Sequence, residues 1–189
     1  MGHQFVTVSI EVDGTTLDNH LAVLAVTCVS TLGEGSTAEL VLDSGNVSKQ
    51  CEPGKRIKIS LGYGDELVSA FSGTIETITL HYDEEGTRTS LVSRSNLDCR
   101  ASPESEPLTI TVGRDVYSFE WTWPSTENPR AFGRITIDGR LGVCPGRTLN
   151  IEGVDPAFAG QSEVLRVKHR LIAGTWTTSA QLKEIKSEK

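Results

Sequence analysis

The sequence has little positive charge, and this shortage limits the kinds of partner it can bind. Its 189 residues include 18 basic and 25 acidic side chains, which give a formal net charge of −7. Nucleic-acid affinity depends largely on Lys and Arg side chains that neutralise phosphates, so we expect no sequence-specific nucleic-acid binding. The two weak basic clusters, around Lys55 and Arg166, alternate with apolar residues, which is typical of the solvated face of a strand.

Closely spaced cysteines and long apolar runs are also missing. The four cysteines, Cys28, Cys51, Cys99 and Cys144, lie far apart. Zinc sites usually bring ligand pairs two to four residues apart, so we expect no metal site but mostly structural thiols, with one disulfide left open. No apolar stretch approaches the roughly 18 residues needed to cross a bilayer, and residues 1–4 do not begin a signal peptide. The sequence therefore predicts a protein without a membrane anchor, made in the cytoplasm.

No helical period is sustained beyond about two turns, whereas apolar and polar residues alternate along most of the chain. The alternating runs are rich in Val, Ile, Thr and aromatic residues and are bounded by turn residues. We predict strands over residues 5–12, 22–30, 38–42, 56–61, 73–81, 88–92, 108–112, 117–123, 134–138, 148–153, 162–171 and 176–182. Residues 66–70 and 157–160 are each predicted as a single helical turn. The fold class is therefore all-β.

An internal repeat divides the chain into two copies of one unit. A-E-L-V-L-D at residues 38–43 matches G-R-I-T-I-D at 133–138, and a Pro-Gly-basic turn before a strand occurs in both halves. Further on, F-S-G matches F-A-G, and a His followed by a Gly-Thr pair occurs in both halves. Proline restricts φ and glycine accepts positive φ, so these positions specify a backbone path. The repeated positions are Pro53, Gly54, Phe71, Gly73, Pro145, Gly146, Phe158 and Gly160.

The two copies meet at a polar, proline-containing stretch that has no strand pattern. We assign residues 1–98 to a first β-barrel, 99–106 to a linker and 107–189 to a second β-barrel. Short strands at turn-punctuated intervals favour barrels or sandwiches. The predicted architecture is two similar small antiparallel β-barrels in tandem, joined by a short linker.

At the repeated blocks the sequence resembles the tail-hub proteins of contractile phage tails and related injection machines. This family includes the phage late control protein D group and the base of type VI VgrG proteins. The resemblance rests on A-E-L-V-L-D, on P-G-K-R-I-K-I-S-L-G-Y-G with F-S-G-T-I-E, and on the closing run from P-G-R-T-L-N-I-E-G-V to G-T-W-T-T. It covers both units.

The resemblance implies a homotrimer in which six barrels form a ring of pseudo-sixfold symmetry. Such a ring adapts the hexameric tail tube to the trimeric spike, so the implied partners are the chain itself, the tube protein, the spike protein and other baseplate proteins. The implied location is the tail or baseplate of a virion, assembled in the host cytoplasm. Hub proteins commonly carry further domains between or after the barrels, and only a short linker separates the repeats here.

Residue types that could carry catalysis are present but form no motif. Ser44 follows a strand in D-S-G, and His20, His81 and His169 could supply a base. His81 and His169 occupy matching positions of the repeat, which favours a structural role. Paired acids are a second possibility, since glycoside hydrolysis needs two carboxyl groups within about 5–10 Å in one cleft.

The candidate acids, Glu76 and Glu163, also match in the repeat and would lie in different barrels. Their better interpretation is as solvent-facing strand residues or as partners in salt bridges between subunits. We therefore expect no catalytic residue and no cofactor.

Four aromatic residues alternate along one predicted strand: Tyr117, Phe119, Trp121 and Trp123. Alternation places all four on one face. That face forms either the core of the second barrel or an interface, because large aromatic side chains often anchor interfaces.

Three functions follow in order of support. The first is a structural tail hub. The second is a soluble double-β-barrel binding module for a saccharide or protein ligand, which would bind through the aromatic face. The third is a hydrolase at the tail tip. Neighbouring genes for tube, spike and baseplate components would distinguish the first from the second.

Overall fold

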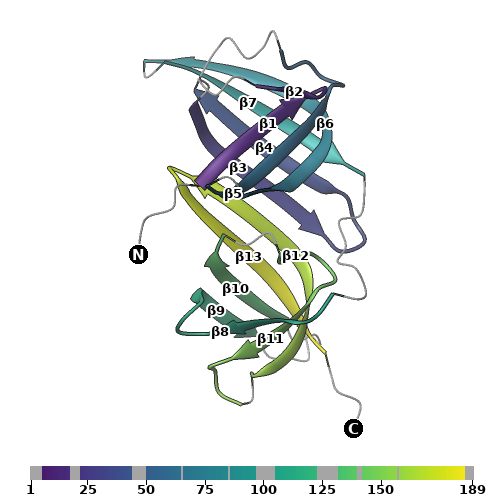
Figure 1. Ribbon diagram of the computed structural model, residues 1–189, viewed down its shortest axis with the longest axis vertical. Coiled ribbons are helices and arrows are strands. Elements are labelled where there is room, and N and C mark those ends of the chain that lie inside the picture. Colours follow the sequence, from purple (N-terminus) through teal and green to yellow (C-terminus); the bar gives the residue numbers. More distant parts are fainter. Residues whose placement is uncertain are drawn as a thin grey trace. The chain divides into compact units, whose positions relative to one another are not determined.

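The computed structural model describes residues 6–17, 22–43, 50–64, 66–84, 86–96, 105–122, 132–139, 142–156 and 158–185. These ranges contain strands and turns and no helix, so the all-β prediction is confirmed. The strands form two compact units (Figure 1). No described helix is long and apolar enough to span a membrane.

The two units do not follow the chain in one cut. Unit 1 comprises Met1–Val29, Gly35–Leu97 and His169–Trp176, and unit 2 comprises Ser30–Glu34, Asp98–Lys168 and Thr177–Lys189. A short segment from late in the sequence thus belongs to unit 1, and a turn from early in the sequence belongs to unit 2.

The first seven strands build most of unit 1, and burial alternates most clearly along residues 36–43 and 86–95, where one face covers the core. They are β1 (Val6–Val12), β2 (Thr15–Thr16), β3 (Ala22–Thr31), β4 (Ser36–Asp43), β5 (Arg56–Tyr63), β6 (Glu66–Asp83) and β7 (Gly86–Ser95). Their order in the sheet is β2-β1-β5-β6-β7-β4-β3. The core of unit 1 includes Val26, Leu40, Leu42, Ile57, Ile59, Leu61, Ile75 and Leu91. Apolar area removed from water at these positions stabilises the unit.

The remaining strands are β8 (Leu108–Thr111), β9 (Val116–Thr122), β10 (Phe132–Asp138), β11 (Thr148–Glu152), β12 (Gly160–Ile172) and β13 (Thr175–Glu184). Their order is β12-β13-β10-β9, with β11 beside β12 and β8 beside β11. The core of unit 2 is made by Ile110, Ile135, Ile137, Val143, Leu149, Ile151, Val164, Val167, Ala180 and Leu182. Among the described pairings only β8 and β11 run parallel, and none closes either set of strands into a complete ring.

The Pro-Gly turns make the same two hydrogen bonds in both units. The Gly54 N–H donates to the Ile75 carbonyl at 2.8 Å, and the Ile75 N–H donates to the Lys55 carbonyl at 2.9 Å. The Gly146 N–H donates to the Val164 carbonyl at 2.8 Å, and the Val164 N–H donates to the Arg147 carbonyl at 2.9 Å. The glycine φ angles are 91° and 79°, which suit glycine best. Ile75 is therefore the structural counterpart of Val164.

This register corrects the alignment expected for the next block. Gly73 lies opposite Ile57 on β5, whereas Ser162 lies opposite the corresponding Leu149 on β11. Gly160 lies two residues earlier, opposite Ile151. The F-S-G and F-A-G segments are thus two residues out of structural register. A match between residue types does not determine which residues pair across two strands.

Two further predictions change with the register. Residues 66–70, predicted as a helical turn, are strand, because they pair with the end of β5 in a hairpin. Of the second predicted helical turn, residue 157 lies outside the described residues. The Phe158 and Ala159 N–H groups both donate to the Asp155 carbonyl, at 2.8 and 3.2 Å, so they belong to a turn that begins at Asp155. Gly160 already begins β12.

The copies differ most at their first strand. β1 runs antiparallel to β5, with Val6 opposite Tyr63. β8 takes the corresponding place beside β11 but runs parallel to it, with Leu108 opposite Leu149.

Candidate functional site

The aromatic strand β9 carries the candidate interface residues, and a β-bulge divides them. Val116 lies opposite Ile137 and Ser118 lies opposite Thr136, so Tyr117 is the extra residue of the bulge. Its side chain is 67% exposed. Alternation alone placed Tyr117 with the other aromatics, and the bulge breaks that alternation. Trp123 lies outside the described residues.

Phe119 and Trp121 lie on the core side of β9. Their rings stack with centroids 6.2 Å apart and planes inclined by 25°, and Phe119 packs against the core of unit 2. The Trp121 ring covers Gly133 on β10, where an added Cβ would lie 2.6 Å from a ring carbon. The Trp121 indole N–H is buried and has no hydrogen-bond partner among the described residues.

A second group of aromatic side chains belongs to unit 1 and was missed by sequence reasoning. The Trp176 ring lies 5.4 Å from that of Tyr63 and 6.3 Å from the imidazole of His169. Trp176 and His169 are only 4% and 8% exposed. Burial lowers the pKa of His169 to about 4, so its imidazole is neutral at pH 7. The local G-T-W pattern predicted a strand there but not which core it would enter.

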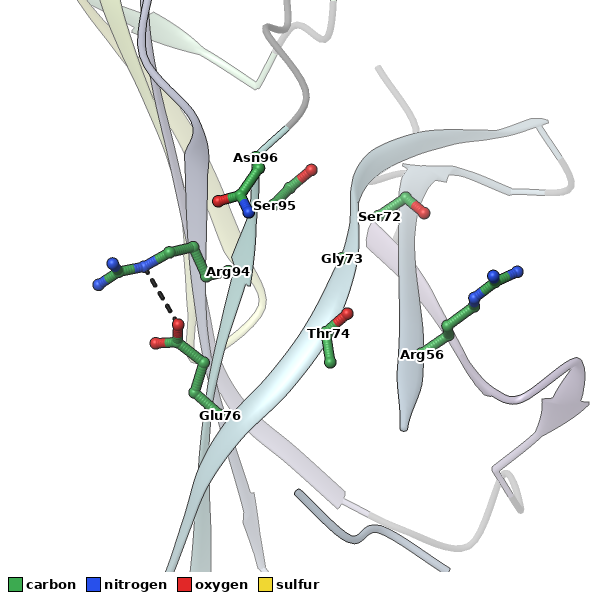
Figure 2. A pocket seen from close by; sticks show the side chains of 8 residues that line it. All are labelled: Arg56, Ser72, Gly73, Thr74, Glu76, Arg94, Ser95 and Asn96. Atoms are coloured by element: carbon green, nitrogen blue, oxygen red, sulfur yellow. Dashed lines mark ion pairs between the residues drawn. The ribbon is translucent and has the colours of Figure 1, made fainter. Parts of the chain in front are cut away.

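A polar hollow with a volume of about 490 Å³ lies on unit 1 (Figure 2). It is lined by Arg56, Ser72, Gly73, Thr74, Glu76, Arg94, Ser95 and Asn96. Figure 2 shows Arg56 and the Glu76–Arg94 ion pair on opposite sides of Gly73, and the pair joins Arg94 Nε to Glu76 Oε1 at 3.3 Å. An added Cβ at Gly73 would lie 2.4 Å from the Arg94 carbonyl oxygen, so only glycine fits.

The candidate catalytic groups are not brought together among the described residues. Glu76 is the only carboxylate lining the polar hollow and is engaged by Arg94, and Glu163 belongs to unit 2. Retaining or inverting glycoside hydrolysis needs two carboxyl groups in one cleft. His81 is exposed, whereas His169 is buried. Ser44 and His20 lie outside the described residues.

Counting from the hairpin turns shows that the candidate pairs are not repeat counterparts. His169 lies three residues before the end of β12, and Leu80 lies three residues before the end of β6. His169 therefore corresponds to Leu80 rather than to His81. Glu163 corresponds to Thr74, since each is opposite the first residue of the preceding strand. The expectation that these histidines and acids match in pairs is therefore wrong, because the letter alignment is two residues out of structural register at the acids and one residue out at the histidines.

A shallow basic hollow of about 250 Å³ lies on unit 2. It is lined by Arg134, Arg166, Lys168, Ser179, Ala180 and Gln181. Sequence reasoning interpreted the Arg166–Lys168 alternation as a solvated face and did not include Arg134, which joins the group only through strand pairing. Arg134 Nη1 lies 3.7 Å from Glu120 Oε2 on β9.

Two free thiols of the described part of the chain, those of Cys28 and Cys51, are buried. Cys28 is 2% exposed, and burial raises its pKa to about 12. Burial also raises the pKa of Cys51, against a smaller opposing effect of Lys55. The described residues contain no group of three or more His, Cys, Asp or Glu side chains suited to a metal ion.

The fold of this chain is shared with solved tail proteins. The tail protein from Neisseria meningitidis MC58 is similar at a TM-score of 0.67 and 11% identity, over 95% of this chain and 96% of that one. The 43 kDa tail protein of prophage MuSo2 from Shewanella oneidensis is similar at a TM-score of 0.62 and 7% identity, again over 95% and 96%. The expectation of a tail-protein fold is thereby confirmed.

A third similar structure is the E. coli c3393 protein, a component of the type VI secretion system described as similar to the T4 bacteriophage tail proteins gp27 and gp5. It matches at a TM-score of 0.70 and 8% identity, over 94% of this chain and 77% of that one. At these identities the similarity is one of fold.

No curated protein matches the sequence. One family model does match it, over residues 2–120, which is more than half of the 189 residues. The chain belongs to the family described as the Alg8 N-terminal domain.

Proposed function

We propose that the chain is a structural tail-hub protein of a contractile phage tail or a phage-like injection particle. Three copies would form a ring of pseudo-sixfold symmetry that adapts a hexameric tail tube to a trimeric spike. The observation that carries the proposal is the match of this two-unit fold to two tail proteins over 95% of this chain and 96% of each of theirs.

The internal repeat supports this role. The same pair of hydrogen bonds anchors the Pro-Gly turn in each unit, so one chain presents two similar faces. A threefold assembly of such chains presents six similar faces, which is the number a hexameric tube needs. The chain itself, the tube protein, the spike protein and other baseplate proteins are the proposed partners, and the tail or baseplate of the particle is the proposed location.

Native mass spectrometry of the full chain tests the proposal. At about 10 μM, alone and co-expressed with any tube and spike proteins that neighbouring genes encode, we expect a mass three times that of the 20.5 kDa chain. A stable monomer under all these conditions would contradict the proposal. A monomer that binds a saccharide or a single protein ligand would instead favour the binding-module alternative.

A further inference from the structure

The β6–β7 and β12–β13 hairpins extend equally far beyond a pair of matching buried threonines. In the β6–β7 hairpin Asp83 pairs with Gly86 around a two-residue turn, and the β12–β13 hairpin turns at Ala173 and Gly174. Thr89 on β7 and Thr178 on β13 are both fully buried and lie opposite the last core residues of β4 and β10. Counting from these positions makes the two hairpin tips structural counterparts.

Both long strands also shift their alternation at corresponding points. β6 has a bulge between Ile75 and Thr77. On β12 buried residues occur at Val164 and next at Val167, a spacing of three that marks the same shift. Beyond the shift, the core side of β6 carries Ile78, Leu80 and Tyr82, and the core side of β12 carries Val167, His169 and Leu171.

These counterparts differ sharply in burial. Val167, His169 and Leu171 are 1%, 8% and 5% exposed. Leu80 and Tyr82 are 57% and 84% exposed, although Leu80 lies directly opposite the buried Thr89 on the core side of the hairpin. The β6–β7 hairpin therefore extends a core-type apolar face that no described residue covers.

The structure shows what covers such a face in the other hairpin. His169–Trp176 belongs to unit 1, where Trp176 contacts the ring of Tyr63. β12 is also the hydrogen-bonded neighbour of β3 in the sheet. The end of the β12–β13 hairpin is thus buried within unit 1.

The counterparts of β12 and β3 both have an open edge among the described strands. β6 pairs with β5 only over Glu66–Thr74, so residues 77–82 pair with β7 alone. β9 neighbours β10 as β3 neighbours β4, and β9 ends the sheet order with no second partner. Open edges readily pair with another chain.

We infer that residues 77–82 of β6 in one copy pair with β9 of a second copy, and that Leu80 and Tyr82 are buried against the unit 2 that contains this β9. The inference rests on the proposed hub function and deepens it by naming the strands that join the copies. Among the described strands, β6 and β9 of each chain present different open edges, so the contact is head-to-tail, and a suitable rotation closes it into a ring.

The test compares two double variants of the full chain by native mass spectrometry and light scattering. Leu80→Ser with Tyr82→Ser removes the uncovered apolar face and is expected to weaken assembly about tenfold or more, as loss of buried aromatic anchors does. Leu67→Ser with Val68→Ser is the matched control, because these side chains are 39% and 57% exposed at the other end of β6. The control is expected to assemble like the wild type, and circular dichroism should show both variants folded.

Hydrogen exchange then identifies the receiving strand. In the wild-type assembly the amides of residues 77–82 and 116–122 are expected to be protected, and both segments should lose protection in Leu80→Ser, Tyr82→Ser. Unchanged protection of residues 116–122 in a dissociated variant would overturn the assignment of β9.

The other outcomes separate this inference from the hub function. Full assembly of Leu80→Ser, Tyr82→Ser, or equal loss of assembly in the control, overturns the inference while a trimeric wild type leaves the hub function standing. A wild-type chain that stays monomeric with tube and spike proteins present contradicts both.

Discussion

At the scale of single residues, burial decides the chemistry of His169. Its imidazole lies against Trp176 and is 8% exposed, and burial lowers its pKa from 6.5 to about 4. The sequence repeat pairs His169 with His81, which is exposed. The residue type was identical in the two places, but only strand register showed that His169 takes the position of Leu80, on the core side.

The buried His169 predicts a pH dependence of stability. Because its folded-state pKa lies below its ordinary value of 6.5, the unfolded chain binds more protons between about pH 6.5 and pH 4. The free energy of unfolding therefore falls as the pH is lowered through this window, by roughly 1.4 kcal/mol per pH unit and up to about 3 kcal/mol in all. Urea titrations at pH 7, 5.5 and 4.5 measure it, and His169→Phe should reduce the slope. An equal slope in this variant would show that other groups carry the pH dependence.

At the scale of elements, alternation located the strands well and the bulges poorly. The runs around Leu40 and Ile135 were predicted from apolar spacing, and β4 (Ser36–Asp43) and β10 (Phe132–Asp138) include them. The extra residue at Tyr117 has no local signal, because a bulge depends on the register of the partner strand. One extra residue moved Tyr117 out of the aromatic face that alternation predicted.

The packing of β9 on β10 predicts that Gly133 cannot be enlarged. An added Cβ would lie 2.6 Å from a Trp121 ring carbon, so Gly133→Ala should displace the indole and lower the free energy of unfolding by about 1–3 kcal/mol. Denaturant titration followed by tryptophan fluorescence measures the change. In Trp121→Leu the same Gly133→Ala substitution should cost less, since the clash is gone. Wild-type stability of Gly133→Ala would contradict this packing.

At the scale of the whole molecule, segments distant in sequence complete one core. Unit 1 includes His169–Trp176, and within this segment Leu171 and Trp176 are 5% and 4% exposed. The sequence predicted a boundary at residues 99–106 because the linker is polar and lacks alternation. A polar linker indicates where one set of strands ends along the chain. It does not indicate to which unit a later segment such as His169–Trp176 belongs.

This composition of unit 1 predicts that a chain ending at residue 106 is weakened although it keeps β1 to β7. Loss of buried Leu171 and Trp176 should lower the stability of unit 1 by roughly 3–6 kcal/mol. Hydrogen exchange of residues 56–63 in the truncated and full chains measures the difference. Trp176→Ala in the full chain should give a smaller effect in the same direction. Equal protection in the truncated chain would show that unit 1 does not depend on the late segment.

The candidate surfaces were only partly accessible to sequence reasoning. The aromatic run was visible because its members are close in sequence, but the basic hollow was not, since Arg134 joins Arg166 and Lys168 only through strand pairing. Likewise Leu80 fell in the strand predicted over residues 73–81 and Tyr82 just beyond it, and nothing local in the sequence indicates that both side chains are exposed.

By itself the sequence determined the all-β class, the approximate position of each long strand and the two Pro-Gly turns, because alternation and turn chemistry are local properties. The tertiary structure alone decided the register, the bulges and the membership of His169–Trp176 in unit 1. These depend on which strand pairs with which. Long-range hydrogen bonds and burial set that pairing, and a one-residue change in register moves every side chain to the other face.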